Sequence, residues 1–259
     1  MSQSLIIRQD GACRFITLNR PERHNAFDDV LIAEMTQAFQ TAIDDDATRI
    51  IVLDSTGKSF SAGADLNWMK RMAAYDYGQN LADSQALAGL MALIDGAPKP
   101  VIAVIQGPAY GGGVGLAACC DMVVAAETAS FCLSEVKLGL IPAIISPYVV
   151  RAMGGRAARR YFQSAETFSA TRAAQLGLVS EVVPTEQLTT QRDRWITALA
   201  ANGPQAMRAA KELALRATEQ ELDDDLRVWT AQRIATIRAS DEGREGVRAF
   251  LEKRKAAWI

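Results

Sequence analysis

The stretch that most constrains the fold runs from residue 98 to residue 121 and joins a short apolar segment to a glycine-rich one. Residues 101–105 are a β-branched run, which predicts a buried strand. After a turn the chain becomes small and apolar from Gly112, which predicts the start of a helix. A helical glycine costs about 1 kcal/mol relative to alanine. Four glycines within residues 111–115 therefore indicate that something approaches the backbone closely. A helix N-terminus there suits an anion, or an oxygen that becomes anionic during a reaction.

The length and composition fit one large globular domain, or one domain with an appendage. The chain has 259 residues, of which 49% are hydrophobic, and a formal net charge of −2. Without a basic block, nucleic acid is not expected as a partner. No apolar run reaches the length of about 18 residues that spans a membrane, and the N-terminus lacks a signal peptide pattern, so no membrane partner is expected. The cysteines, Cys13, Cys119, Cys120 and Cys132, show no CxxC spacing, which is typical of reduced thiols in a cytoplasmic protein.

The order of the expected elements divides the chain near residue 200. Before it, strands and helices alternate, beginning with a hairpin that turns at Asp10-Gly11 and a helix capped by Asp28 or Asp29. Beyond it the pattern is helical to the end. We therefore predict a β/α core over residues 1–200 and an all-α region over residues 201–259. The amphipathic tail is either a helical cap on its own core or a contact between subunits.

Two glycine-containing turns and one carboxylate are the main chemical signals. The turn at Ala62-Gly63-Ala64, like the one over residues 111–113, lies between a strand and a helix. Side by side, two such turns could direct two backbone N–H groups at one carbonyl oxygen. Glu135 stands in the otherwise apolar segment 130–136. Most glutamates are solvated, but in such a setting desolvation raises the pKa, which makes Glu135 the best candidate for proton transfer.

Other kinds of site fit the sequence less well. Gly113, Gly115 and Ala118 match the dinucleotide pattern GxGxx(G/A), but they lie too far beyond the end of the strand. No Lys-Ser/Thr pair follows the glycines, which excludes a P-loop. A serine or cysteine triad needs a histidine, and His24 is the only one. A zinc site fits no better, because the chain has one histidine and two of its cysteines, Cys119 and Cys120, are adjacent.

Six groups of residues, each weakly specific alone, together match a known family. They are residues 18–22 with 25–26, 60–66, 99–101, 111–113 with 120–121, Glu135 with 138–139, and 245–254. On these motifs the chain resembles the enoyl-CoA hydratase/isomerase (crotonase) family over essentially its full length.

The resemblance implies a fold, a substrate and a set of site residues. The fold is an α/β spiral of ββα units with a C-terminal helical trimerisation region, assembled as a homotrimer or a dimer of trimers. The substrate is an acyl-CoA thioester, whose coenzyme A is part of the substrate, and neither cofactor nor metal is needed. By position, the amides of Ala62 and Gly112 fall at the oxyanion hole, and Glu135 falls at the catalytic position. The residues lining the substrate and CoA path are Ala62, Gly63, Ala64, Asp65, Leu66 and Gly112.

One departure from the family pattern bears on the reaction. Many hydratases of the family use two glutamates 20 positions apart, and here Gly115 stands 20 positions before Glu135. Residues 131–135 and 139–154 resemble bacterial methylglutaconyl-CoA hydratases of leucine degradation and their isohexenylglutaconyl relatives, which favours hydration of a glutaconyl-type ester. A Δ3,Δ2-enoyl-CoA isomerase and a non-catalytic acyl-CoA-binding or RNA-binding homologue remain as alternatives. We expect Gly115 to leave space for a β-substituted or carboxylate-bearing acyl chain.

Overall fold

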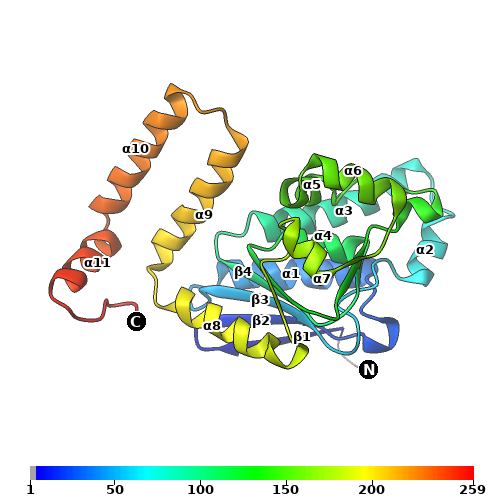
Figure 1. Cartoon of the computed structure of the whole chain (residues 1–259), viewed down its shortest axis with the longest axis horizontal. Helices are drawn as coiled ribbons and strands as arrows, with labels where there is room; N and C mark the ends of the chain where they lie inside the picture. The colour runs from blue at the N-terminus through cyan, green and yellow to red at the C-terminus, as the bar shows by residue number, and fades with distance from the viewer. Residues whose placement is uncertain (1–3) are drawn as a thin grey trace.

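Two sheets organise the N-terminal part of the molecule. The computed structural model describes residues 4–259. The larger sheet has six strands in the order β1 (Leu5–Asp10), β2 (Cys13–Leu18), β3 (Ile50–Ser55), β4 (Val101–Ile105), β6 (Met122–Ala126) and β9 (Glu181–Val183), as Figure 1 shows in part. The smaller sheet has the order β5 (Ala109–Tyr110), β7 (Ser130–Cys132) and β8 (Phe168–Ser169). The pairings β1–β2 and β7–β8 are antiparallel and the others are parallel.

Helices cover the larger sheet, connect its strands and, at the C-terminal end, extend away from it. They are α1 (Asp29–Asp44), α2 (Leu66–Met72), α3 (Tyr77–Asp95), α4 (Gly112–Ala118), α5 (Ser146–Met153), α6 (Gly155–Ser164), α7 (Ala170–Gln175), α8 (Leu188–Ala200), α9 (Pro204–Glu219), α10 (Asp224–Ala239) and α11 (Asp241–Leu251). Helix α1 contacts β1, β2 and α3, whereas α8 contacts β3, β4 and β6. The α/β architecture and the helical C-terminal region expected from the sequence are both present, with a mixed sheet and helical layers.

Most local predictions agree with the structure. The hairpin pairs Asp10 with Cys13 across its turn, and the side chain of Asp28 caps α1 by accepting from the amide of Leu31. The helical stretch after Asp65 breaks before Tyr77, where Asp76 caps α3. The sequence did not indicate the short strand β5, because two residues are too few to show a period.

The core lies where apolar strands meet helices on both faces. In β3, Ile50, Ile51, Val52 and Leu53 have no exposed surface. Continuous burial of this kind is typical of a parallel strand that is covered on both sides. From α1, buried side chains pack into this core at the spacing of one helical face: Leu31, Met35, Phe39 and Ala42. The core thereby fixes the carboxyl ends of β3 and β4, from which the two glycine-containing turns emerge.

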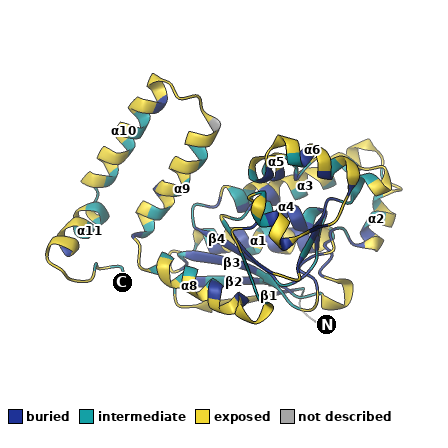
Figure 2. Cartoon of the chain, in the orientation of Figure 1, coloured by how far each residue is buried: buried dark blue, intermediate teal, exposed yellow. Residues whose placement is uncertain are grey.

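The last three helices, α9, α10 and α11, extend away from the sheets as an arm (Figure 1). Figure 2 shows that most of the arm is exposed, and its large apolar side chains include Leu222 (95% exposed) and Phe250 (82%). Both ends of the arm are held at one place. Arg49 donates hydrogen bonds to the carbonyl oxygens of Ala200 (3.2 Å) and Asn202 (2.5 Å) before α9, and of Trp258 (2.9 Å) after α11. Helix α8 ends at Ala200, and the domain boundary at residues 200/201 stays a prediction.

Candidate active site

The first part of the site is the loop that leaves β3 and turns at residues 62–64. Its backbone is held from two sides. Phe27 pairs with Ala64 as in a parallel bridge, since Phe27 donates to the carbonyl of Gly63 and accepts from the amide of Asp65. Ser61 pairs with Ala109 in the same way. The loop therefore lies directly against β5 and the start of α4, so the two turns are side by side.

The backbone amides of this turn differ in whether they have a hydrogen-bond acceptor, and this difference corrects one prediction. The amide of Ala62 donates to the carbonyl of His24 at 2.9 Å, so it is not available for an oxyanion. The amide of Gly63 donates to the hydroxyl of Ser61 at 3.2 Å. Within the described part of the chain, the amide of Ala64 has no protein acceptor. The assignment of Ala62 to the oxyanion hole is therefore wrong for this structure, and Ala64 offers the free donor.

The second part of the site is the N-terminus of α4. The amide of Gly111 is bound to the carbonyl of Cys132 at 2.8 Å, but among the described residues those of Gly112 and Gly113 have no protein acceptor. A β-carbon on Gly112 would lie only 2.2 Å from the ring of Phe27. Because the backbone of Phe27 also holds the turn at Ala64, the same residue positions both candidate donors.

Glu135 reaches this place from the smaller sheet. Strand β7 pairs with β5, and the chain then forms a short 3-10 helix, Glu135–Leu138. A β-carbon on Gly111, whose φ is +51°, would lie 3.2 Å from Oε1 of Glu135. A side chain at residue 111 would thus contact the carboxylate, and glycine also suits the left-handed backbone. The carboxylate of Glu135 therefore lies next to the first turn of α4.

The surroundings of Glu135 make its carboxylate unusual. Its Oε2 is buried and accepts no hydrogen bond from any described residue. Burial raises the pKa of Glu135, and the hydrogen bond with its own backbone opposes this only in part. A buried oxygen without a partner is costly in a folded protein and is often kept for a reaction or a ligand. The apolar setting expected from the sequence is thus present.

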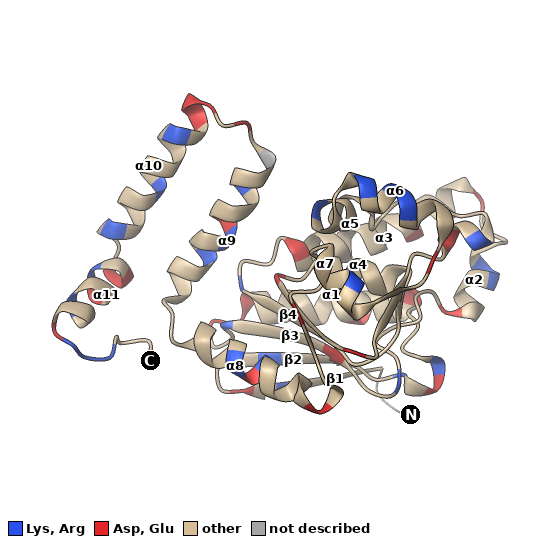
Figure 3. Ribbon diagram, in the orientation of Figure 1, with Lys and Arg blue, Asp and Glu red and all other residues tan. Residues whose placement is uncertain are grey.

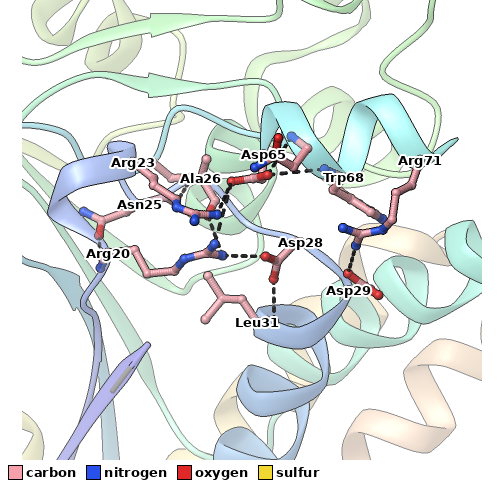
Figure 4. A network of polar contacts seen from close by, with 12 residues as sticks. Arg20, Arg23, Asn25, Ala26, Asp28, Asp29, Leu31, Asp65, Trp68 and Arg71 are labelled. Atoms are coloured by element: carbon pink, nitrogen blue, oxygen red, sulfur yellow. Dashed lines mark hydrogen bonds and ion pairs between the residues drawn. The ribbon is translucent and has the colours of Figure 1, made fainter. Parts of the chain in front are cut away.

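Asp65 stabilises the turn through the contacts of its carboxylate (Figure 4). Its Oδ1 caps α2 by accepting from the amides of Asn67 (2.8 Å) and Trp68 (3.2 Å). Its Oδ2 pairs with Arg23 (3.1 Å) and Arg20 (3.7 Å). Burial alone would raise the pKa of Asp65, but these hydrogen bonds and the charge of Arg23 hold it below its usual value.

The neighbouring site residues differ in exposure. Asp65 is only 5% exposed, whereas Leu66 is 74% exposed at the first position of α2. Their predicted contact with the substrate and CoA stays a prediction, as does that of Ala62, Gly63, Ala64 and Gly112. The carboxylate of Asp65 already binds two amides and two arginines, so in this structure it orders the turn.

Gly115 does not leave open space, and this corrects a second prediction. A β-carbon on Gly115 would lie 2.1 Å from Cγ2 and 2.8 Å from Cβ of Ile145, and 3.4 Å from Cε of Met91. Ile145 is 2% exposed and stands at the start of α5. The space beside Gly115 is filled by this side chain, so the glycine permits close packing of α4 on α5. Sequence reasoning missed Ile145 because nothing in the local pattern connects residues 115 and 145.

Several alternatives from the sequence gain no support from the geometry. The glycines of the dinucleotide pattern face protein: a β-carbon on Gly113 would meet the carbonyl of Ser61 at 2.8 Å. His24 contacts the hydroxyl of Ser59, which is buried. Among the described residues, no group of three acidic, histidine or cysteine side chains could hold a metal ion, and the four cysteines are free. In residues 4–259 no helix is both long and apolar enough to cross a membrane.

A separate cavity of about 720 Å³ lies between α6 and α7. Four arginines line it: Arg156, Arg159 and Arg160 of α6 and Arg172 of α7. Figure 3 shows basic residues along α6. None of the candidate site residues lines this cavity. It is therefore distinct from the site at Glu135.

Comparison with known proteins extends over nearly the whole chain. The sequence pattern of one family, described as enoyl-CoA hydratase/isomerase, matches residues 8–259. The crystal structure of an enoyl-CoA hydratase from Shewanella pealeana has a TM-score of 0.96 and 46% sequence identity, covering 99% of this chain and 96% of that chain. The 2,3-dehydroadipyl-CoA hydratase of Escherichia coli is 33% identical over 255 residues, which cover 98% of this chain and 97% of that protein. The crotonyl-CoA hydratase of Syntrophomonas wolfei is 31% identical over 259 residues, which cover 99% of this chain and 98% of that protein.

Proposed function

Because the chain belongs to the enoyl-CoA hydratase/isomerase family, we propose that it adds water to, or removes water from, the α,β double bond of an enoyl-CoA thioester. The observation that carries the proposal is the carboxylate of Glu135. Its buried Oε2 has no partner among the described residues, and it lies beside a helix N-terminus with free amides. A proton-transferring group next to oxyanion donors is what this reaction needs.

The free amides of Ala64 and Gly112 are the proposed oxyanion donors. They would hold the thioester oxygen, onto which negative charge moves as an enolate when water attacks Cβ. Each amide belongs to backbone that is already fixed, one by the pairing with Phe27 and the other by α4. Donors held in place before the reaction lose little free energy to reorganisation, and one such donor contributes about 3–4 kcal/mol in other enzymes.

Glu135 is proposed to move the proton in both halves of the reaction. The oxygen of water bonds to Cβ, the π electrons of the double bond move toward the thioester oxygen, and Glu135 takes one proton from the water. The enolate then collapses, and Glu135 returns that proton to Cα. One molecule of water is added in total, and the carboxylate ends in its starting state. A raised pKa suits this role because the group must both accept and release a proton near neutral pH.

For the acyl chain we favour 3-methylglutaconyl-CoA or a related glutaconyl-CoA. Residues 131–135 and 139–154 resemble hydratases of that kind. Residue 115, where many relatives place a second glutamate, is glycine, so the water lacks a carboxylate from that position. A carboxylate on the substrate could act as its second partner. The name of the Escherichia coli relative denotes an acyl chain that also ends in a carboxylate. The region beside Gly115 gives no further support to this choice, because the side chain of Ile145 fills it and leaves no space for the acyl chain.

The single carboxylate also favours a second candidate function. A Δ3,Δ2-enoyl-CoA isomerase needs one group to carry a proton between two carbons, and Glu135 alone could do so. A non-catalytic acyl-CoA-binding or RNA-binding protein is the third possibility, but it would leave a desolvated carboxylate without a use.

The arm formed by α9–α11 supports a homotrimer or a dimer of trimers. Its exposed apolar side chains include Leu222, Phe250 and Leu251, which are at least 73% exposed in the single chain. Apolar area of this kind is buried when subunits associate, and cyclic trimers give closed contacts of one repeated type.

Turnover of three CoA esters tests these proposals together. Purified protein is incubated with 3-methylglutaconyl-CoA, crotonyl-CoA and a 3-enoyl-CoA, and the products are separated by chromatography. Hydration with the highest kcat/KM on the glutaconyl ester is the expected result. Double-bond migration in the 3-enoyl ester without hydration would identify an isomerase. Binding of CoA esters without turnover of any would refute the enzymatic proposal.

A further inference from the structure

Gly111, next to Glu135, and Gly115, next to Ile145, both lie at the first turn of α4. Gly111 and Gly115 are four positions apart, which is about one turn of a helix. At Gly111, an added β-carbon would meet the carboxylate of Glu135; at Gly115, it would meet Ile145. Ile145 therefore stands where a side chain on residue 115 would begin, one hydrogen-bonded turn from the residue that contacts Glu135.

The fit between these two residues leaves no room for both side chains to be large. Real β-carbons essentially never approach other heavy atoms closer than 3.0 Å, yet both Cγ2 and Cβ of Ile145 would be closer than that. Ile145 is 2% exposed, and Met91, which is fully buried, closes the other side. Close-packed interiors accommodate an added methylene only by displacing neighbours.

We propose that Ile145 determines the number of catalytic carboxylates: it occupies the volume that a second acid at residue 115 would need, and so it restricts the site to Glu135. This inference rests on the proposed hydration. An apolar side chain beside the reacting water offers no hydrogen bond. Enoyl esters without a polar group near Cβ then leave the water with Glu135 as its one charged partner. Ile145 is thus a specificity-determining residue that favours acyl chains which bring a polar group with them.

A stability cycle tests the packing, with a matched control at the same residue. Gly115→Ala alone is expected to lower the melting temperature. The Ile145→Gly variant lacks both clashing atoms, so adding Gly115→Ala to it is expected to lower the melting temperature only slightly. The Ile145→Val variant retains Cγ2 and Cβ, so adding Gly115→Ala to it is expected to lower the melting temperature as much as in the native protein. If Gly115→Ala lowered the melting temperature equally in the native protein, in Ile145→Gly and in Ile145→Val, the steric part of the proposal would be overturned.

Catalysis is tested by building the second acid. Gly115→Glu with Ile145→Gly is expected to raise kcat on crotonyl-CoA about tenfold or more over Ile145→Gly alone, and to add a second ionisation to the pH profile. Gly115→Glu with Ile145→Val is expected to show neither effect. If the double variant Gly115→Glu with Ile145→Gly folds and its rate and pH profile match those of Ile145→Gly alone, the proposal is overturned.

A chemical test covers the case in which the double variant does not fold. Formate is a small carboxylate that can enter the space opened by Ile145→Gly. It is expected to accelerate crotonyl-CoA hydration by that variant in a saturable manner and to leave Ile145→Val unaffected. Absence of this acceleration in a folded Ile145→Gly variant would overturn the proposal. Failure of the proposed function looks different, because the native protein would then turn over no ester while the stability cycle still showed the steric coupling.

Discussion

Replacing Glu135 with glutamine is the most direct test of the site. The amide keeps the size of the side chain but cannot accept the proton from water. General acid–base groups contribute about 10²- to 10⁴-fold, so kcat is expected to fall by that factor, which corresponds to about 3–5 kcal/mol of barrier. Stability should move the other way. Burial raises the pKa of Glu135, so ionisation of this group disfavours the folded state at neutral pH, and the neutral amide is expected to leave the melting temperature equal or higher.

The assay compares kcat on the best CoA ester with a melting scan of each protein. Glu127→Gln is the matched control, because Glu127 is an exposed glutamate in the turn before β7, and it should change neither quantity. If Glu135→Gln kept more than about a tenth of the native kcat, the lost interaction would be under about 1.4 kcal/mol, and Glu135 would not be the proton-transferring group.

Four further results are expected. The acid limb of the pH profile of kcat/KM should lie above the ordinary pKa of glutamate, because Glu135 works as a base only above its raised pKa; a limb at or below the ordinary value would contradict this. Asp65→Ala should lower stability by about 2–4 kcal/mol in urea unfolding, since it removes the cap of α2 and the ion pairs with Arg20 and Arg23; because the pKa of Asp65 is depressed, this contribution is present at neutral pH and should vanish as the pH falls through the acid range. Arg49→Ala should cost about 1–3 kcal/mol and increase proteolysis near Trp258, whereas unchanged proteolysis would show that the hydrogen bonds do not hold the arm. Sedimentation at micromolar concentration should give a trimer or a multiple of it, and a monomer would contradict the assembly proposed from Phe250 and its neighbours.

The elements that were predicted well are those whose structure is determined by residues close to them in the sequence. The β-branched run of β4 and the carboxylate of Asp28 at the start of α1 each specify their structure within a few residues. The two glycine-containing turns were also indicated locally, because each lies between a strand and a helix. β5 has two residues, and only its pairing with β7 identifies it as a strand.

The details of the site depended on contacts between distant segments. The amide of Ala62 and that of Ala64 are equivalent in the sequence, and they differ because the carbonyl of His24 occupies the first of them. Whether a glycine provides space or close packing is decided by its neighbour, and for Gly115 that neighbour is Ile145. Neither His24 nor Ile145 carries a local signal that points to these contacts.

The contact between α4 and α5 also constrains how such a site can change during evolution. A larger residue at position 115 would clash while Ile145 is present, so that step alone is expected to be eliminated by its cost in stability. Shrinking residue 145 first opens a cavity, which lowers stability but leaves Glu135 in place. Either single step lowers stability, so under the proposed function a second acid at residue 115 is reached only through an intermediate that is less stable than its ancestor. The contact between Gly115 and Ile145 thus makes the gain of a second acid depend on which substitution occurred before it.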